Sequence, residues 1–562
     1  MLALSLLTLS ALAASPAQSS APNWNQGPGP MGNWHSEGVD PPPLRFSVRT
    51  GENILWRTPL PETGQGGIAI WEDRVFVATM APWDESMVLS EEEAALYKHA
   101  TENRKVVGKH IDAHCLDANT GKILWTRRIE GEVPAIYSYP FSDATSASPV
   151  TDGEHVWFTN AAGRLVCFTV EGEPVWERRW TPNFDGPFNK QFEPILVRDV
   201  IDGEQRRVLI HMEPRPAPDT ERPKDLHGRW HYLFGVDAKT GKILWQSEDA
   251  LTQYNAPIQI TFGAEPMIGM LHARGGPHAV PERPVGMSLT AIAGPQRGQS
   301  VARFDDPRGN HEASLHTMTA TSAGVCWVMK EPRNAVAILD AKTLQEAKEI
   351  SLTQGVHHRE RDPETGEWTA HEGIDLERGV FPARYTAIGM FIRPQLFFQC
   401  YATAWGKPTV GPAYSFARVD TESGKVEYLE VPSGVARVYD EGTGEWHDQF
   451  IWRTPQQSRA INSSGVERTG DDRSRWDGWD WVFNGSPTRF NNRLYFTTAS
   501  GLVYVLDAYA KQWDESALLA VNDLGPAGET WSANSLSICG GKLFHRTARE
   551  LICVGKAPSR SR

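Results

Sequence analysis

The chain has little cysteine, no excess of basic residues and no long apolar run in its interior. Its six cysteines are dispersed over 562 residues with no adjacent pair and no Cys-x-x-Cys spacing, which excludes a disulfide framework. The net charge of -13 and the absence of a long basic run exclude the electrostatic pattern of a nucleic-acid partner. No later apolar run reaches 18 residues, so the sequence predicts no membrane span.

The N-terminus is the one strongly apolar part of the chain. Leu2 to Leu12 is too short to cross a bilayer, and Ala11-Leu12-Ala13 fits a small-x-small cleavage site. We interpret residues 1–14 as a signal peptide, which predicts a secreted or periplasmic protein. The run carries no Lys or Arg, and a disordered apolar tail is the alternative.

Turn-forming and aromatic residues are abundant where cysteine is scarce. The chain has 49 Gly, 39 Pro and 21 Trp, which favours short strands and frequent turns over helices. At this length it must form several domains or one large repeat architecture.

A repeated motif decides between those two possibilities. LDANTGKILW at 116–125 recurs as VDAKTGKILW at 236–245, and in each case a buried strand precedes it. Asp can bond the amides of a turn and Gly tolerates a positive φ, so the motif predicts a β-hairpin. A second hairpin pattern, with the turn Asp152-Gly153, lies at 147–160. Four short strands in about forty residues are typical of a β-propeller blade.

Eight copies of this unit can be traced. They begin near Gly66, Thr145, Gln191, Tyr254, Ala313, Phe381, Trp481 and Trp531. The copy at 254–304 is degenerate, which leaves seven blades as an alternative. The last copy lacks its fourth strand, whereas Asn53-Ile-Leu-Trp-Arg-Thr58 has the form of a fourth strand without the other three. We therefore predict an all-β, eight-bladed propeller of four-stranded blades, with the ring closed by an N-terminal strand.

The expected organisation is a signal peptide at 1–14, an N-terminal extension at 15–50, the propeller at 51–556 and a disordered tail at 557–562. Four insertions fall between the second and third strands of their copies, at 80–106, 212–229, 271–285 and 399–412. Loops in that position share one face of a propeller, so we expect them to form a roof over one end of the ring. Segments 355–379 and 433–475 are expected to be irregular connections between blades.

The Asp-Ala-x-Thr-Gly-Lys-x-x-Trp hairpins, with Ser-Pro-Val-x-Asp-Gly upstream, resemble the repeats of the pyrroloquinoline-quinone (PQQ)-like propellers. The resemblance covers roughly residues 50 to 556. It implies an eight-bladed ring in which the motif tryptophans dock on the neighbouring blade, a structural role that we carry over to Trp56, Trp125, Trp176 and Trp245. The superfamily includes both quinone-dependent dehydrogenases and non-catalytic scaffolds.

The enzymes of this superfamily hold PQQ beside a ring made by two adjacent bonded cysteines and use a Ca²⁺ site. This sequence has no Cys-Cys pair and no segment that reproduces the Ca²⁺ site. We therefore assign no catalytic residue, no metal and no cofactor. PQQ and Ca²⁺ remain the cofactors of the alternative interpretation.

Residues at the entry of each innermost strand should converge on the ring axis. These predicted rim residues are Asp143, Glu193, Asn255, His311, Glu312, His316, Arg384, Trp481, Asn484 and Trp531. A polar and aromatic rim suits a small polar ligand, a sugar or a peptide. The alternative is that these groups bond blade connections and trapped water.

One predicted roof loop is distinctive for its charged residues, which include Arg274, His278 and Arg283. Its arginines suit a carboxylate or sulfate ligand. A rigid loop with internal ion pairs is the alternative. A looser cluster of His357, His358 and His371 lies in a charged segment and is expected on a solvated surface.

The sequence thus favours a binding or scaffold module for a protein, a polysaccharide or a small polar ligand, and we expect a monomer. The alternatives are a periplasmic dehydrogenase of alcohols or sugars that uses PQQ and Ca²⁺, and a hydrolase or lyase that uses the axial His, Glu and Arg residues.

Overall fold

The repeated Asp-x-x-Thr-Gly motif forms the tight turn that its composition predicts. Between β6 (Ile111–Asp117) and β7 (Ile123–Ile129), Asp117 Oδ1 accepts the N–H groups of Asn119 at 3.0 Å and Thr120 at 2.8 Å. Gly121 adopts a φ of 73° and its N–H donates to the Asp117 carbonyl at 2.8 Å. Asp237 organises the same turn between β15 (Arg229–Asp237) and β16 (Ile243–Leu251).

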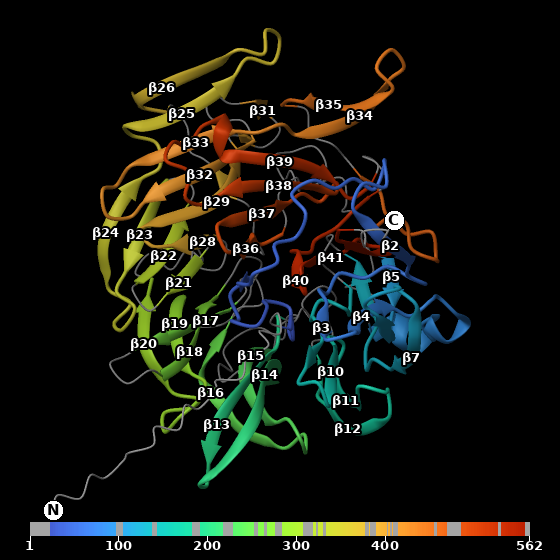
Figure 1. Ribbon diagram of the computed structural model, residues 1–562. Helices are drawn as coiled ribbons and strands as arrows, with labels where there is room; N and C mark the ends of the chain where they lie inside the picture. Colours follow the sequence, from blue (N-terminus) through green and yellow to red (C-terminus); the bar gives the residue numbers. More distant parts are fainter. Residues whose placement is uncertain are drawn as a thin grey trace, which may run out of the picture.

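Eight sheets arise from these hairpins in the computed structural model. It describes residues 23–96, 105–137, 143–182, 192–216, 229–251, 257–262, 267–275, 284–306, 318–321, 324–329, 333–376, 381–382, 389–401, 403–404, 407–408, 414–453, 458–468, 485–525 and 530–556. The sheets stand side by side around a common axis (Figure 1).

The blades follow one another in sequence order. Blade 1 contains β3 (Ala69–Trp71), β4 (Arg74–Met80), β6 and β7. Blade 2 contains β9 (Val150–Thr151), β10 (His155–Asn160), β11 (Arg164–Thr169) and β12 (Pro174–Arg179). Blade 3 contains β13 (Ile195–Ile201), β14 (Glu204–Pro216), β15 and β16. Blade 4 contains β17 (Ile258–Phe262), β18 (Met267–Arg274), β19 (Gly286–Ala291) and β20 (Ser300–Asp305).

The second half of the ring is built in the same way. Blade 5 contains β21 (Met318–Thr321), β22 (Gly324–Met329), β23 (Ala335–Leu339) and β24 (Glu346–Ser351). Blade 6 contains β27 (Phe381–Pro382), β28 (Met390–Ile392), β29 (Gln395–Tyr401), β32 (Ser415–Asp420) and β33 (Val426–Glu430). Blade 7 contains β36 (Thr488–Phe490), β37 (Arg493–Thr497), β38 (Leu502–Asp507) and β39 (Leu518–Asp523). Blade 8 contains β40 (Ser537–Cys539), β41 (Lys542–Arg546), β42 (Glu550–Val554) and β2 (Ile54–Pro59).

This topology confirms eight blades and the predicted closure. The degenerate fourth copy is a complete four-stranded sheet, so the seven-blade alternative is wrong. β2 pairs antiparallel with β42, with Trp56 opposite Cys553, and so completes the last blade with an N-terminal strand. The ring therefore leaves no open edge between its first and last blades.

The insertions add smaller elements between the second and third strands of their blades. The first insertion carries η1 (Glu85–Met87), α1 (Glu91–Leu96) and β5 (Lys105–Gly108), and β5 pairs with β8 (Ala135–Tyr137). β30 (Thr403–Ala404) and β31 (Lys407–Pro408) pair within blade 6. Outside these insertions, a short η3 (Glu515–Ala517) lies between the third and fourth strands of blade 7. None of the described helices has the length and apolar character needed to cross a membrane.

Two segments expected to be irregular are instead β-hairpins. β25 (Val356–Arg361) and β26 (Trp368–Ile374) form the first, and β25 adds in parallel to the outer strand β33 of blade 6. β34 (Gly434–Asp440) and β35 (Glu445–Ile451) form the second. Both project from the rim of the ring at the top of Figure 1. The expectation failed because the turn motif Asp-x-x-Thr-Gly also occurs at Asp362 and Asp440 outside the eight copies.

The N-terminal extension is an integral part of the ring. The Trp24 carbonyl accepts the Ile70 N–H of blade 1 at 2.6 Å, and the Asn25 carbonyl accepts Thr151 N–H of blade 2 at 2.8 Å. Gln26 Oε1 accepts the Leu196 N–H of blade 3 at 2.9 Å. Further along, β1 (His35–Ser36) pairs in parallel with β36 of blade 7. Figure 1 shows this dark-blue segment among the innermost strands at the middle of the ring.

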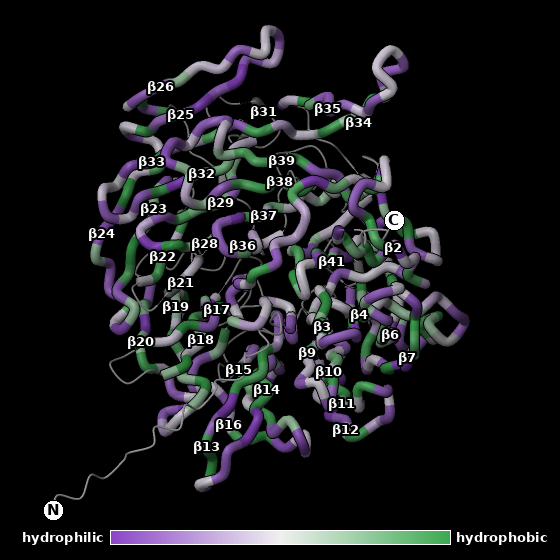
Figure 2. The backbone as a smooth tube through the Cα atoms, in the orientation of Figure 1, coloured by the Kyte–Doolittle hydropathy of each residue, from purple (hydrophilic) through white to green (hydrophobic). Residues whose placement is uncertain are grey.

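Hydrophobic side chains fill the space between the blades. The largest buried cluster runs through blades 8, 1, 4, 5, 6 and 7, and Figure 2 shows green, hydrophobic stretches along strands such as β14, β38 and β39. All six cysteines are buried and unbonded. Burial raises the pKa of the Cys115 and Cys167 thiols to about 12, so both behave as small apolar groups.

Candidate binding site at the blade-entry end

Buried polar side chains converge where the chain enters the innermost strands of blades 1, 2 and 3, which we call the blade-entry end. Asp143 Oδ1 accepts the Thr145 N–H at 2.8 Å and its hydroxyl at 2.6 Å. Thr145 Oγ1 in turn accepts the Gln65 N–H at 2.8 Å from the entry of blade 1. Hydrogen bonds between the entry segments thus fix these side chains at the inner wall of the ring.

Glu193, at the entry of blade 3, continues the same network. Its Oε2 accepts the Ser148 N–H at 3.0 Å, and Ser148 Oγ accepts the Gly67 N–H at 2.8 Å. A Cβ at Gly27 of the N-terminal segment would collide with the Glu193 carboxyl group. Part of the Glu193 surface remains accessible, but burial of the carboxyl group raises its pKa to about 7.

Two arginines bring positive charge to this network. Arg546, the last residue of β41, donates from Nη1 to the Gly66 carbonyl at 2.6 Å. Arg468 Nη2 lies 3.6 Å from Asp143 Oδ2. Both arginines are almost fully buried, and burial lowers the pKa of Arg546 to about 10, although Asp143 opposes that shift. We call Asp143, Glu193, Arg468 and Arg546 the entry cluster.

Arg468 reaches the cluster on a connection that crosses the blade-entry end. Residues 458–468 come after the β34–β35 hairpin and precede blade 7. Ala460 packs with Trp531 and Ala548 of blade 8, and Val466 belongs to the hydrophobic cluster of blades 1 and 2. The Ser463 N–H donates to Glu62 Oε2 at 2.8 Å. This segment thus covers the entry side of blades 8 and 1.

Several enclosed polar atoms of the site have no hydrogen-bond partner among the residues that the structure describes. They are Nε and Nη2 of Arg546 and both side-chain polar atoms of Gln65. Such atoms also occur elsewhere in the described residues, but here four of them lie where Arg546 meets residues 64–66, which offers unused hydrogen-bonding capacity to a ligand.

Of the predicted rim residues, the structure describes three. Asp143 and Glu193 belong to the entry cluster, whereas Trp531 is 3% exposed and packs under the 458–468 segment. The others lie outside the described residues: Asn255, His311, Glu312, His316, Arg384, Trp481 and Asn484.

Arg274 of the predicted roof loop is fully buried at the end of β18. It donates from Nη2 to Asp305 Oδ1 at 2.7 Å and to the Met287 and Phe304 carbonyls. These contacts match the internal ion pair that was the alternative for this arginine. His278 and Arg283 lie outside the described residues.

The motif tryptophans lie between blades. Nε1 of Trp56 donates to Ala118 of blade 1 at 3.1 Å, that of Trp125 to Val170 of blade 2 at 2.9 Å, and that of Trp176 to Ala238 of blade 3 at 3.0 Å. Each indole also covers the turn glycine of the blade it reaches. Trp245 differs, because its Nε1 has no hydrogen-bond partner in the described part of the chain and its ring lies against Gly235 of its own blade.

The histidine cluster of the first hairpin is only partly solvated. His358 is 5% exposed, its ring stacks on that of His371, and burial lowers its pKa to about 4. His371 Nε2 lies 3.0 Å from Glu360 Oε2. The expected solvated surface is therefore wrong for His358, because strand pairing with blade 6 covers it.

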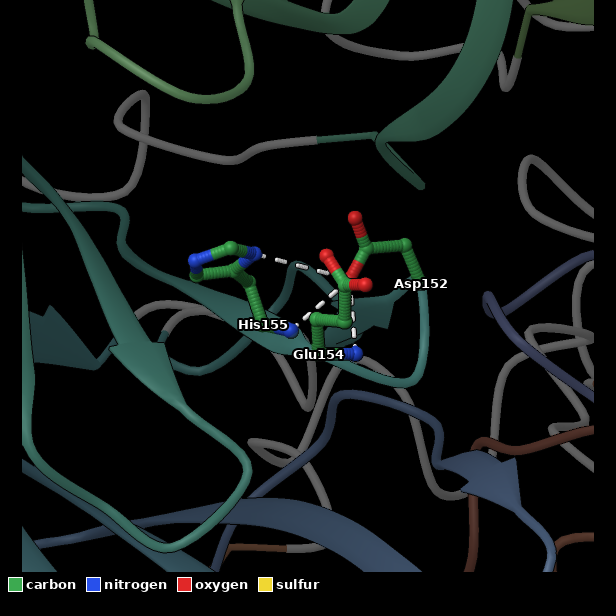
Figure 3. Close-up of side chains that lie close together, drawn as sticks. All are labelled: Asp152, Glu154 and His155. Atoms are coloured by element: carbon green, nitrogen blue, oxygen red, sulfur yellow. Dashed lines mark hydrogen bonds and ion pairs between the residues drawn. The ribbon is translucent and has the colours of Figure 1, made fainter.

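Asp152, Glu154 and His155 form the one group of three metal-ligand side chains that the described residues bring within 4.8 Å (Figure 3). They sit on the first turn of blade 2. Asp152 Oδ1 accepts the N–H groups of Glu154 and His155, and Oδ2 is paired with Arg207. Both oxygens of the Asp152 carboxylate are thus already bonded, one within its own turn and one to Arg207.

The described residues do not fit the quinone and Ca²⁺ of the alternative interpretation. All six cysteines are unbonded, and none is adjacent to another in sequence. The described axial carboxylates are engaged with Thr145, Ser148 and Arg468 rather than gathered as oxygen ligands. No chemical step is therefore derived through PQQ.

Comparisons with known proteins agree with the strand pairing. Residues 45–262, from β2 to β17, match the PQQ_2 family model, described as outer membrane protein assembly factor BamB. The eight four-stranded sheets show the fold of an eight-bladed β-propeller, and the family match covers residues 45–262 of it. No curated protein sequence matched the chain.

Among solved structures, the quinohemoprotein alcohol dehydrogenase from Comamonas testosteroni is 11% identical, with a TM-score of 0.45, covering 97% of this chain and 83% of that chain. The ADHIIG enzyme from Pseudomonas putida HK5 is 10% identical, with a TM-score of 0.46 and coverage of 96% and 81%. BamB from Moraxella catarrhalis is 10% identical, with a TM-score of 0.31 and coverage of 74% and 96%. Likeness of this degree carries no argument about activity.

Three residues of the site were not predicted from the sequence. Arg546 lies within an ordinary strand, and Arg468 lies in a segment expected to be irregular. Gln65 directly precedes the first copy, and its position beside the other blade-entry residues was the available signal.

Proposed function

We propose that the protein is a non-catalytic binding propeller whose entry cluster receives the anionic group of a small polar ligand. The observation that carries this proposal is the set of enclosed, unpartnered polar atoms on Arg546 and Gln65. A guanidinium group with unused N–H donors favours a carboxylate or sulfate, because charge-assisted bonds are the strongest that it can make. A neutral sugar has no anionic group with which to make charge-assisted bonds of this kind.

The position of the N-terminal segment indicates from which end of the ring a ligand would reach the entry cluster. Its hydrogen bonds to blades 1, 2, 3 and 7 place it along the innermost strands, beside the first turns of blades 1 and 7. A ligand would therefore approach from the blade-entry end. The apolar run at 1–14 supports a secreted or periplasmic location for this binding function.

Thermal unfolding in the presence of succinate, sulfate or glucose tests the proposal. We expect succinate and sulfate to raise Tm with concentration and glucose to leave it unchanged, because a ligand that binds only the folded state stabilises it by mass action. Gln65→Leu should abolish the shift. The same substitution at the exposed Gln354 is the matched control and should preserve it.

An equal shift in both variants, or no shift with any anion, would contradict an anion site at Gln65 and Arg546. Adding PQQ with Ca²⁺ tests the dehydrogenase alternative. Bound-quinone absorbance together with dye-linked oxidation of an alcohol or sugar would replace the binding function by that enzyme activity.

A further inference from the structure

The junction between blades 6 and 7 lacks the indole that covers the turn of the next blade at the junctions from blade 8 to blade 3. In blade 1, that indole belongs to Trp125 of β7, which lies opposite Cys115, two residues before the end of β6. At the same position of β32 in blade 6 lies Arg418, and the residue opposite it on β33 is Glu427. An ion pair thus takes the place of the indole.

This ion pair reaches blade 7 but leaves space at the junction. Arg418 Nη2 lies 2.6 Å from Glu427 Oε2, and Arg418 Nη1 donates to the Ala510 carbonyl of blade 7 at 2.6 Å. A cavity of about 400 Å³ lies between the ion pair, the β28–β29 turn and residues 508–511 of blade 7. This volume lies within the range of small-molecule sites.

The cavity has more positive than negative charge. Four cationic side chains and two carboxylates line it. Both carboxylates are already bonded, Glu427 to Arg418 and Lys425, and Asp420 to the amides of its own turn. Lys511 is exposed and makes no ion pair with any of the described residues. The free cationic capacity therefore favours a ligand with two negative charges.

The cavity also has an apolar wall, formed by Ile392, Pro394, Ala508 and the ring of Tyr509. The Tyr509 side chain is 61% exposed, and its hydroxyl accepts a hydrogen bond from Arg489 Nη2 at 2.9 Å. Because water and salt screen exposed cations, a bare sulfate or succinate gains little free energy of binding here. A ligand that also covers the apolar wall gains more.

We propose that this cavity binds a small aromatic phosphate monoester. The phosphate group carries close to two negative charges and three strong acceptor oxygens, which match the surplus of cationic side chains. An aromatic ring matches the Tyr509 ring and the apolar residues beside it.

This cavity is separate from the entry cluster. It lies at turns that follow the first and third strands of blades 6 and 7, and antiparallel strands place those turns at the end of the ring opposite the blade-entry end. The entry cluster lies instead at the entries of blades 2 and 3 and at the end of β41 in blade 8.

Calorimetric titration with phenyl phosphate at about pH 8 tests this cavity in the Gln65→Leu variant, in which the entry cluster should not respond. We expect inorganic phosphate, which lacks the ring, to bind roughly tenfold more weakly. Tyr509→Ala and Lys511→Gln should each lower the affinity about threefold. The matched controls are Tyr439→Ala, on the β34–β35 hairpin, and Lys122→Gln, on the corresponding turn of blade 1. Both remove exposed side chains and should leave the affinity unchanged.

Three results would overturn the proposal. They are no heat of binding with phenyl phosphate, equal affinities for phenyl phosphate and inorganic phosphate, and equal losses of affinity in the cavity variants and the control variants. Because Tyr509 and Lys511 are exposed, an unchanged Tm checks that their variants are folded. Each of these results leaves the succinate and sulfate test of the entry cluster unaffected, since that test compares Gln65→Leu with the wild type.

Discussion

At the residue scale, one contact repeats at three successive blade junctions: an indole from one blade covers the turn glycine of the next. The glycine has two structural roles in this contact. It adopts a positive φ that other L residues avoid, and its missing Cβ makes room for the ring. Trp176 over Gly241 is a clear example, since a Cβ at Gly241 would lie 2.7 Å from the indole.

Gly241→Ala should therefore destabilise the protein more than Gly203→Ala. Both glycines have a positive φ, 73° and 80°, but a Cβ at Gly203 meets nothing within 4 Å. The backbone strain of about 1–2 kcal/mol is common to both variants, whereas the collision with Trp176 adds about 1–3 kcal/mol in Gly241→Ala alone. Urea unfolding measures the difference. Equal losses of unfolding free energy in the two variants would show that the Trp176 indole moves aside without any loss of stability.

At the element scale, the N-terminal segment binds the ring from inside. Trp24 is fully buried in the main hydrophobic cluster and its backbone pairs with Ile70 of blade 1. Because the same segment reaches blades 2, 3 and 7, loosening it weakens contacts to several blades at once.

Trp24→Ala should lower the free energy of unfolding by about 3–5 kcal/mol, the usual loss for a buried indole. Met31 lies in the same segment but is 60% exposed, so Met31→Ala should change it by less than about 0.5 kcal/mol. Chemical denaturation of the two variants gives the comparison. A small loss for Trp24→Ala would mean that the segment is not part of the cooperative fold.

The elements also show what the sequence can and cannot predict. Each blade is built from hairpins between residues that are close in sequence. The motif at 116–125 and the lone Ile-Leu-Trp at 54–56 were therefore enough to predict the ring and its closure. The entry cluster depends instead on long-range contacts. Arg468 approaches Asp143 on the connection between the β34–β35 hairpin and blade 7, and no local pattern encodes that contact.

At the scale of the whole molecule, buried histidines make stability sensitive to acid. Burial lowers the pKa values of His114, His272, His358 and His545 to about 4, against 6.5 for an ordinary histidine. Their neutral forms contribute stability that is complete above pH 6.5 and is lost as the pH falls toward 4. Glu193 acts in the opposite sense, because its raised pKa gives stability that is complete below about 4.5 and lost above about 7.

Because these histidines outnumber Glu193, the free energy of unfolding should fall between pH 6.5 and pH 4. Each histidine contributes at most ~3 kcal/mol to this loss. Urea unfolding at several pH values should show a shallower fall for His545→Gln than for the wild type. His447→Gln removes an exposed histidine and should follow the wild-type curve. Identical pH dependence in all three proteins would contradict the role of buried histidine.

The closure by β2 has a kinetic consequence. Arg57 of β2 pairs with Glu550 of β42 across 493 residues of sequence, and Ser47 bonds Asp523 across 476. Loops of this size must close before such contacts form, which makes the final step of folding slow relative to the formation of single blades. A ribosome releases residues 54–59 long before it completes residues 550–554. β2 therefore waits, unpaired, for β42, the last strand to be made.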